Sequence, residues 1–127
     1  MEMNFNQISS LSDTLNSLKD KTLPFKLSLI IAKDLAILQK EFEFYIDQER
    51  QFANTYLQTD ENGKFIQESE GVFKIKDGME DECRTAREDL DNFTTDIELR
   101  KIPIKLIENM ELTPSQVGAL ELIIEEE

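Results

Sequence analysis

The sequence offers few of the side chains that enzymes use as nucleophiles, bases or metal ligands. It contains no histidine and a single cysteine, Cys83. A thiol needs a neighbouring base to act as a nucleophile, and Cys83 falls on the apolar seam of a predicted helix, which favours a small buried side chain. No Ser/His/Asp set and no phosphate-binding glycine loop occurs in the sequence. Carboxylates are abundant, as in a paired-carboxylate hydrolase, but no spacing singles out a pair. We therefore expect a protein that is not an enzyme.

Two acidic stretches have the composition of cation sites but not the spacing. The segment Asp60-Glu61-Asn62-Gly63 begins like a calcium loop, yet an EF-hand has its glycine at the sixth position and this glycine is the fourth residue. A turn is predicted instead. The second stretch, residues 80–91, has no histidine and no second acidic cluster at a fixed distance, so a solvated helix face is predicted. We expect no metal and no cofactor.

Three lysines, Lys26, Lys33 and Lys40, recur every seven residues. In a helix this spacing places the three ammonium groups along one edge of an apolar face. We expect them to flank that face and to meet acids of a partner helix. The alternative is that they hold an anion together with Arg100 and Lys101, in which case the protein would be a sponge for a small anionic ligand.

The chain is strongly and unevenly negative. Its 27 Asp and Glu residues and 14 Lys and Arg residues give a net charge of −13. Residues 77–96 and 108–127 each have a net charge of −6 and supply nearly all of it. Such a field repels nucleic acids and anionic membranes and favours basic partners.

Nothing in the sequence indicates a membrane or a secretory route. The best apolar run, Leu29–Ala32, is far shorter than the roughly 18 residues of a membrane span. The first residues lack the basic and apolar regions of a signal peptide. A single cysteine forbids an internal disulfide and fits a reducing compartment. We expect a cytoplasmic protein.

Apolar periodicity predicts three helices before residue 100. They cover residues 6–19, 22–57 and 79–97, with Thr22 as the cap of the second. In the third, apolar residues alternate at steps of four and three, which is the spacing of a coiled-coil seam. Because residues 27–38 are apolar on nearly every side, we expect them to be covered on most sides.

β structure is predicted between the second and third helices. Residues 64–68 and 72–76 are short β-candidates around Ser69-Glu70-Gly71, a loop that suits a hairpin with its glycine in the left-handed region. Beyond residue 97, apolar residues alternate over residues 102–106. Pro103 restricts that segment to an edge strand or an extended crossover.

A capping box predicts the start of the last helix. Thr113 precedes Gln116 by three residues, and Pro114 suits the first helical position. Val117, Leu120 and Ile124 would share one face of that helix. The glutamates at 125–127 oppose the helix dipole, so we expect its end to fray.

The predicted fold class is mainly α, in a single domain of residues 1–127. Residues 39–57 and 79–96 would form an antiparallel, coiled-coil-like helical hairpin, the stalk. A small β hairpin within residues 58–78 would lie at its tip. The N- and C-terminal segments, residues 1–38 and 97–127, would form a helical head. A homodimer is the alternative, in which a second copy covers part of the apolar surface of residues 27–36.

Four motifs follow one another over most of the chain. They are Thr22-Leu23-Pro24 before the long helix, the segment from Leu38 to Tyr45, the turn from Asp60 to Lys64, and Ile104-Lys105-Leu106 before Leu112-Thr113-Pro114-Ser115-Gln116. Their order resembles a group of small uncharacterised proteins encoded by phages and prophages of Gram-positive bacteria. The resemblance implies a phage accessory protein in the cytoplasm of the bacterial host, with no known active site. The helix–hairpin–helix order is also similar to a prefoldin subunit, from which the unequal helices and residues 97–127 depart.

The leading functional hypothesis is a non-catalytic, acidic protein-binding module, acting as an accessory or assembly factor or as an inhibitor of a host protein. The apolar residues of the predicted β hairpin outnumber what two strands bury alone. These partner-binding candidates are Phe65, Ile66, Val72, Phe73 and Ile75. The alternative is an acidic nucleic-acid mimic that blocks a host enzyme. The acidic-face candidates for that role are Glu80, Asp81, Glu82, Glu88, Asp89 and Asp91.

The charge distribution generates a first prediction. We expect no binding to duplex DNA at physiological salt, because a protein with a net charge of −13 gains nothing from releasing the counterions of DNA. A mobility-shift assay at increasing protein concentration measures this. A shifted band at low protein concentration would contradict the prediction.

Overall fold

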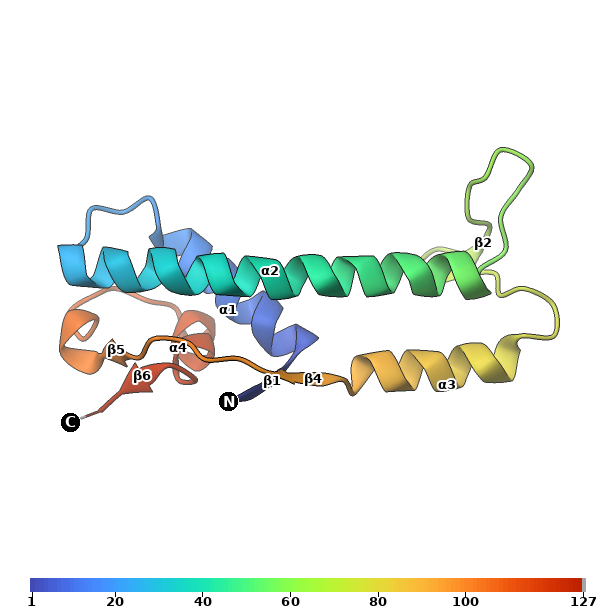
Figure 1. Ribbon diagram of the computed structural model, residues 1–127. Helices are drawn as coiled ribbons and strands as arrows, with labels where there is room; N and C mark the ends of the chain where they lie inside the picture. Colours follow the sequence, from blue (N-terminus) through green and yellow to red (C-terminus); the bar gives the residue numbers. More distant parts are fainter. Residues whose placement is uncertain (127) are drawn as a thin grey trace. The chain divides into compact units, whose positions relative to one another are not determined.

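The protein is mainly helical in a computed structural model that describes residues 1–126 (Figure 1). Four α-helices hold just over half of the chain: α1 (Phe5–Leu18), α2 (Phe25–Tyr56), α3 (Glu80–Asp91) and α4 (Pro114–Leu120). A short 3₁₀ helix, η1, covers Ile104–Leu106. The predicted fold class, mainly α with small β elements, is confirmed at this level.

Six short strands pair two by two. Strands β1 (Glu2–Asn4) and β4 (Thr94–Asp96) are antiparallel, as are β2 (Gln67–Ser69) and β3 (Val72–Phe73), whereas β5 (Ile102–Pro103) and β6 (Ile124–Glu125) are parallel. Only the β2–β3 pair joins strands that are close in sequence. The other two pairs bring distant parts of the chain together.

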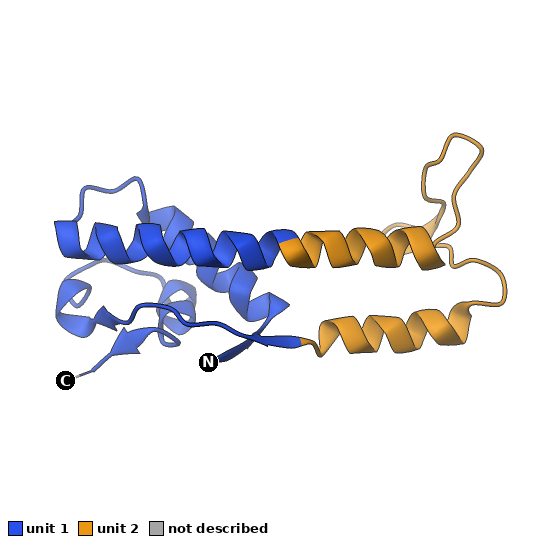
Figure 2. Cartoon of the chain, in the orientation of Figure 1, with its two compact units in different colours: residues 1–43, 94–127 blue, residues 44–93 orange. Residues whose placement is uncertain are grey.

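The chain divides into two compact units (Figure 2). The first unit is residues 1–43 with 94–127, and the second unit is residues 44–93. Helix α2 contributes to both. Its first part belongs to the first unit and its last part, from Phe44 to Tyr56, belongs to the second. That the two units unfold together stays a prediction.

Helix α1 forms as its sequence predicts. Asn4 Oδ1 accepts a hydrogen bond from the Gln7 backbone N–H, and Gln7 Oε1 accepts one from the Asn4 backbone N–H, both at 2.9 Å. This reciprocal capping box satisfies two amide groups that have no partner within the helix. The predicted apolar face is buried: Ile8, Leu11, Leu15 and Leu18 are all fully buried.

Most of the buried apolar side chains belong to the first unit. Besides the face of α1 they are Met3, Leu27, Ile30, Ile31, Leu38, Ile97, Ile102, Ile107, Leu120 and Ile123. They come from α1, α2 and α4, from strands β1 and β5, and from the connections of this unit. The first unit therefore has its own apolar core.

The start of α2 differs from the prediction. The helix begins at Phe25, and the carbonyl of Pro24 accepts the first helical hydrogen bond, from the Ser28 N–H at 3.0 Å. Thr22 lies three residues before the helix and does not cap it. Pro24 therefore occupies the N-cap position, directly before the first turn of the helix.

The prediction that α3 continues to residue 97 is wrong. The helix ends at Asp91, and residues 94–96 form β4, which pairs Thr95 with Met3 of β1. The Ile97 N–H also donates to the carbonyl of Met1 at 2.9 Å. β-Branched threonines favour this extended conformation, and pairing with the N-terminus supplies the hydrogen bonds that another helical turn would have made. Ile97 thus enters the core of the first unit.

Residues 124 and 125 are paired, whereas the sequence predicted a helix with a frayed end. The capping box of Thr113 and Gln116 is confirmed, with hydrogen bonds of 2.8 and 3.2 Å. However, α4 stops at Leu120, and Ile124 lies in β6 beside Ile102. Pairing with β5 gives the backbone of residues 124–125 hydrogen bonds that replace those of a longer α4. Glu127, part of the predicted frayed end, lies outside the described residues.

The expected cover over residues 27–38 is incomplete. Leu27, Ile31 and Leu38 are buried, but Leu29 is 37% exposed, and Phe25, just before this segment, is 80% exposed. One face of α2 in the first unit is therefore left open.

Asp34 is a fully buried carboxylate on the covered side of α2. Its Oδ1 accepts a hydrogen bond from the Arg100 backbone N–H at 2.8 Å, while Oδ2 has no hydrogen-bond partner among the described residues. Burial raises the pKa of Asp34, and the hydrogen bond and charge of Arg100 oppose this rise without cancelling it. The hydrogen bond from Arg100 holds the segment before β5 against α2. Removing the Asp34 carboxylate from water costs free energy.

Within residues 1–126, no helix combines the length and the apolar character that a bilayer crossing requires.

The core of the first unit generates a second prediction. Ile31 is 2% exposed, so Ile31→Ala should lower the free energy of unfolding by about 2–5 kcal/mol. Urea melts followed by circular dichroism measure this. Ile37→Ala is the matched control on the same helix, because Ile37 is 38% exposed and should lose far less. A loss below about 0.5 kcal/mol for Ile31→Ala would show that this core is wrongly assigned.

Candidate functional site

An aromatic contact holds the beginning of the second unit together. Tyr45 is 1% exposed, and its hydroxyl donates a hydrogen bond of 3.3 Å to the carbonyl of Phe93. The two rings meet edge to face with their centroids 5.8 Å apart. This arrangement satisfies the one polar atom of a buried tyrosine ring.

An ion-pair cluster joins α2 to α3 within this unit. Arg87 donates two hydrogen bonds to the Glu49 carboxylate, Nη1 to Oε2 at 2.9 Å and Nη2 to Oε1 at 2.5 Å. The same guanidinium bonds to Asp91, one turn along α3, and lies 4.7 Å from the centroid of the Phe52 ring. Hydrogen bonding to Arg87 lowers the pKa of Glu49, with burial opposing and the guanidinium charge assisting. Glu49 lies at a position of α2 where the helical spacing from Tyr45 to Phe52 predicts an apolar residue, and the cluster explains why a charged residue is found there.

The segment after α2 joins the β hairpin through a closed set of backbone hydrogen bonds. The Gln58 N–H donates to the Lys74 carbonyl (2.8 Å), the Lys74 N–H to the Ile66 carbonyl (2.7 Å), and the Ile66 N–H to the Gln58 carbonyl (3.0 Å). The predicted hairpin exists, but its strands are shorter than expected. The sequence predicted pairing between two segments only. In the structure a third segment, residues 57–59, also forms β-bridges to Ile75 and Phe65.

Both turns of this region form locally. Asp60 Oδ1 accepts hydrogen bonds from the backbone N–H groups of Asn62 and Lys64, at 2.8 and 3.0 Å. Gly63 and Gly71 have φ angles of 79° and 77°, the left-handed conformation that glycine adopts without strain. The predicted turn is therefore confirmed, and the Asp60 carboxylate accepts hydrogen bonds from the backbone of this turn.

An apolar pocket of about 670 Å³ lies beside the hairpin, and we call it the hairpin pocket. Its wall consists of Glu49, Arg50, Phe52, Ala53, Leu57, Phe65, Gly71, Val72, Phe73, Ile75, Cys83 and Arg87. Val72 is 51% and Phe73 41% exposed, although Phe73 meets the ring of Phe65 edge to face at 6.3 Å. Glu49, Arg50 and Arg87 form the charged edge of an otherwise apolar wall.

Four of the five partner-binding candidates meet in this pocket. They are Phe65, Val72, Phe73 and Ile75. Ile66 is half-buried and does not line the pocket, although its backbone holds the hairpin to Gln58. The structure therefore gathers most of the predicted residues, and adds Phe52 of α2 and Leu57, which directly follows that helix.

The six acidic-face candidates are all exposed on α3. Glu80, Asp81 and Glu82 form its first turn, where carboxylates stabilise the helix dipole. Asp91 is held by Arg87, and the remaining two acids, Glu88 and Asp89, lie between these ends. The structure thus gives four of the six a structural role in or beside α3.

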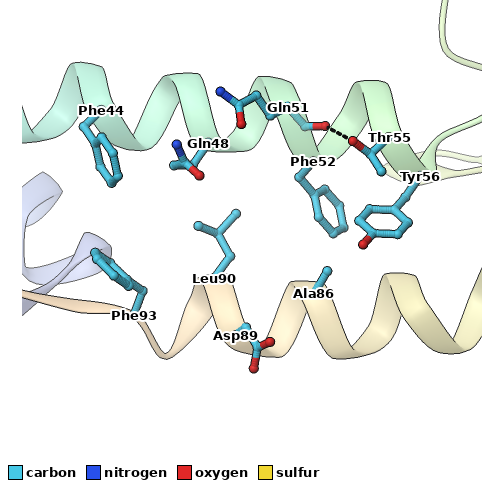
Figure 3. A pocket seen from close by; sticks show the side chains of 10 residues that line it. All are labelled: Phe44, Gln48, Gln51, Phe52, Thr55, Tyr56, Ala86, Asp89, Leu90 and Phe93. Atoms are coloured by element: carbon cyan, nitrogen blue, oxygen red, sulfur yellow. Dashed lines mark hydrogen bonds between the residues drawn. The ribbon is translucent and has the colours of Figure 1, made fainter.

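A second, smaller groove of about 380 Å³ lies between the last part of α2 and α3 (Figure 3). Phe44, Phe52 and Tyr56 project from α2 toward α3, and Leu90 projects back toward them. Asp89 lines the groove from α3. This groove combines aromatic side chains with an acidic edge.

Cys83 is buried, at 6% exposure, as the heptad pattern predicts. No group of three or more His, Cys, Asp and Glu residues placed to hold a metal ion occurs among residues 1–126.

The prediction that Lys26, Lys33 and Lys40 meet acids of a partner helix is wrong within the described part of the chain. All three are exposed, and no carboxylate of residues 1–126 lies within ion-pair distance of them. The physical reason is that the side of α2 buried in the first unit, at Leu27, Ile31 and Leu38, is not the side that carries the lysines. Lys101, the proposed fifth member of an anion site, donates instead to the carbonyl of Leu122 at 3.2 Å.

Sequence reasoning missed Arg87 as a functional neighbour of the hairpin pocket. The available signal was Glu49, an acid at an apolar position of a long ladder. A half-buried acid requires a cation from the facing helix, and α3 carries only Arg84 and Arg87. Arg84 pairs with Asp81 on its own helix instead.

Comparison of the chain with protein families, with curated proteins and with solved structures gave no match.

The Glu49–Arg87 pair generates a third prediction, on pH. A carboxyl whose pKa is lower in the folded state stabilises the fold above its ordinary pKa, and this stabilisation is lost as pH falls through the folded-state pKa. Glu49→Gln should therefore lower the free energy of unfolding at pH 7 by about 0.5–1 kcal/mol, since both side chains are partly exposed. The difference from the wild type should shrink below about pH 4.5.

Urea melts of both proteins between pH 3 and pH 7 measure this difference. Asp47→Asn is the matched control, because Asp47 pairs only with Arg50 on an exposed surface. A Glu49→Gln effect that is independent of pH would contradict an electrostatic role for the pair.

Proposed function

We propose that this chain is a non-catalytic protein-binding module and that the hairpin pocket receives its partner. The observation that supports this most strongly is the pair Val72 and Phe73, which remain 51% and 41% exposed beside an apolar pocket. Contiguous exposed apolar patches often mark interaction sites.

The charge around the pocket suggests the chemistry of the partner. Residues 44–93 contain 13 Asp and Glu against 6 Lys and Arg, a net charge of −7. The pocket wall itself carries Glu49, Arg50 and Arg87, but the unit as a whole is acidic and would attract a segment that presents one or two apolar side chains flanked by Lys or Arg. The apolar side chains would supply affinity, and the charges would supply the rate of association and the choice of partner.

The last part of α2 and α3 would form an antiparallel, coiled-coil-like helical hairpin as the scaffold of this site. Three interactions support this arrangement: Tyr45 with Phe93, Glu49 with Arg87, and the Tyr56 carbonyl with the Lys76 N–H at 2.8 Å. Partners along α2 are met in reverse order along the returning chain, as in an antiparallel pair. A rigid scaffold of this kind would hold the pocket in a fixed geometry.

We further propose a phage origin, a location in the cytoplasm of a bacterial host, and a role as an accessory or assembly factor or as an inhibitor of a host protein. The order of motifs from Thr22 to Gln116 supports the origin. The absence of histidine from the sequence supports a non-catalytic role.

A second candidate function is an acidic nucleic-acid mimic. It is favoured by the exposure of all six carboxylates of α3, which carries only two basic residues. In that case the partner would be a nucleic-acid-binding enzyme of the host. The carboxylates of α3 would bind where that enzyme binds the phosphate groups of a nucleic acid.

The proposal generates a fourth prediction, which separates the two functions. Val72→Ser with Phe73→Ser should abolish capture of the partner from bacterial lysate, because it removes the exposed apolar surface of the pocket. Glu68→Ser with Glu70→Ser, exposed in the same hairpin, is the matched control and should retain capture. Quantitative pull-down measures this, and thermal melts confirm that both variants fold.

Charge reversal on α3, with Glu88→Lys and Asp89→Lys, completes the design. If capture depends on these acids and not on Val72 and Phe73, the mimic function is supported and the pocket proposal fails. Capture that survives every variant would reject both functions.

A further inference from the structure

The open face of α2 in the first unit carries a second apolar seam. Phe25, Leu29, Ala32 and Ala36 follow one another at steps of four, three and four residues, and all four are exposed. Phe25 is 80% and Leu29 37% exposed. This alternation is the spacing of the a and d positions through which one helix packs against another.

Three lysines border this seam on one side. Lys26 and Lys33 each follow a seam residue directly, and Lys40 continues the same seven-residue spacing. This is the e position of a heptad, where charges select the partner helix. We call the four seam residues and three lysines together the lysine seam. Its lysines have no ion-pair partner within residues 1–126, as described above.

The orientation of the lysine seam follows from the packing of the same helix into the core. The opposite side of the same turns, at Leu27, Ile31 and Leu38, is buried in the core of the first unit, which fixes the orientation of the open face. Ala32 and Ala36 would let the backbone of a second helix approach closely, while Phe25 and Leu29 provide larger side chains at one end. A basic, partly apolar helix face thus lies on a protein with a net charge of −13.

We propose that the lysine seam binds an amphipathic helix of a partner protein that carries acidic residues every seven positions beside its own apolar seam. Charge complementarity with Lys26, Lys33 and Lys40 is the reason for this choice. The inference goes beyond the proposed function, because it concerns a different unit of the chain and a partner of opposite charge.

Charge also argues against two other occupants. Two copies of the seam packed antiparallel would bring e positions together, lysine against lysine, which is repulsive. An anionic bilayer would meet a unit that is itself acidic, since residues 1–43 and 94–127 contain 14 Asp and Glu against 8 Lys and Arg. Both occupants are outcomes of the test below.

The test uses the whole protein and two synthetic helical peptides of four heptads. Both peptides have Leu and Ala at their seam positions. One has Glu at the flanking positions, and the other has Lys there. Fluorescence anisotropy with labelled peptide should show the Glu peptide binding at least about tenfold more tightly than the Lys peptide. Its affinity should fall as salt is raised, because the contacts lie at the surface.

Two double variants with the same change of charge locate the site. Lys26→Glu with Lys33→Glu should weaken the Glu peptide about tenfold or more. The matched control, Lys19→Glu with Lys21→Glu, changes exposed lysines outside the seam and should leave binding nearly unchanged. Phe25→Ser should also weaken binding without lowering the melting temperature, because Phe25 is mostly exposed.

Several outcomes would overturn the proposal. They are equal binding of the two peptides, no binding of either, and equal losses in the two double variants. Sedimentation that shows self-association through Phe25 would assign the seam to a second copy. Binding to vesicles of phosphatidylserine and phosphatidylcholine, lost in Lys26→Glu with Lys33→Glu, would assign it to an anionic membrane.

Discussion

Burial of one face of α2 is the interaction on which the rest of the structure depends. The helix has 32 residues and its environment changes along its length. In the first unit its covered face is apolar and packs into a core with Leu27, Ile31 and Leu38. In the second unit Tyr45 is the one residue of α2 that is fully buried, and the next position of the same face is Glu49. Burial of apolar side chains holds the first part of α2 in place, and the ion pair of Glu49 with Arg87 helps to hold its last part.

The two carboxylates on α2 show opposite consequences of burial. Asp34 is enclosed with a single backbone hydrogen bond, so desolvation dominates and its pKa rises. Glu49 is half-exposed and meets Arg87 through two hydrogen bonds, so hydrogen bonding dominates and its pKa falls. Desolvation acts on both groups, and the number and charge of the partners decide which effect is larger. Asp34 therefore weakens the fold when it is ionised, and Glu49 strengthens it.

The same division explains where interaction surfaces are found. The second unit buries few large apolar residues, so Val72 and Phe73 remain available at the hairpin pocket. In the first unit α2 is covered on one side only, which leaves the lysine seam in solvent. The unit that contains the hairpin pocket is acidic as a whole, with a net charge of −7, and the lysine seam is basic, so the two surfaces would select partners of different charge. If both proposals hold, the chain would join two different proteins.

Local patterns in the sequence determined the helices, their buried faces and several details. The spacing of Ile8, Leu11, Leu15 and Leu18 defined the buried face of α1, the Thr113–Gln116 capping box defined the start of α4, and the heptad position of Cys83 indicated its burial. Each of these features depends on residues within about three helical turns. The aromatic and β-branched residues of the hairpin likewise indicated four of the residues that line its pocket.

Only the tertiary structure decided the features that join distant residues. Pairing of β1 with β4 ended α3 at Asp91, and pairing of β5 with β6 ended α4 at Leu120. Arg87 became the partner of Glu49, and the lysines of α2 were left without one. The physical reason is that a strand or a charge gains its free energy from a partner elsewhere in the chain. Periodicity shows that a face must be covered, but which segment covers it depends on the packing of all the others.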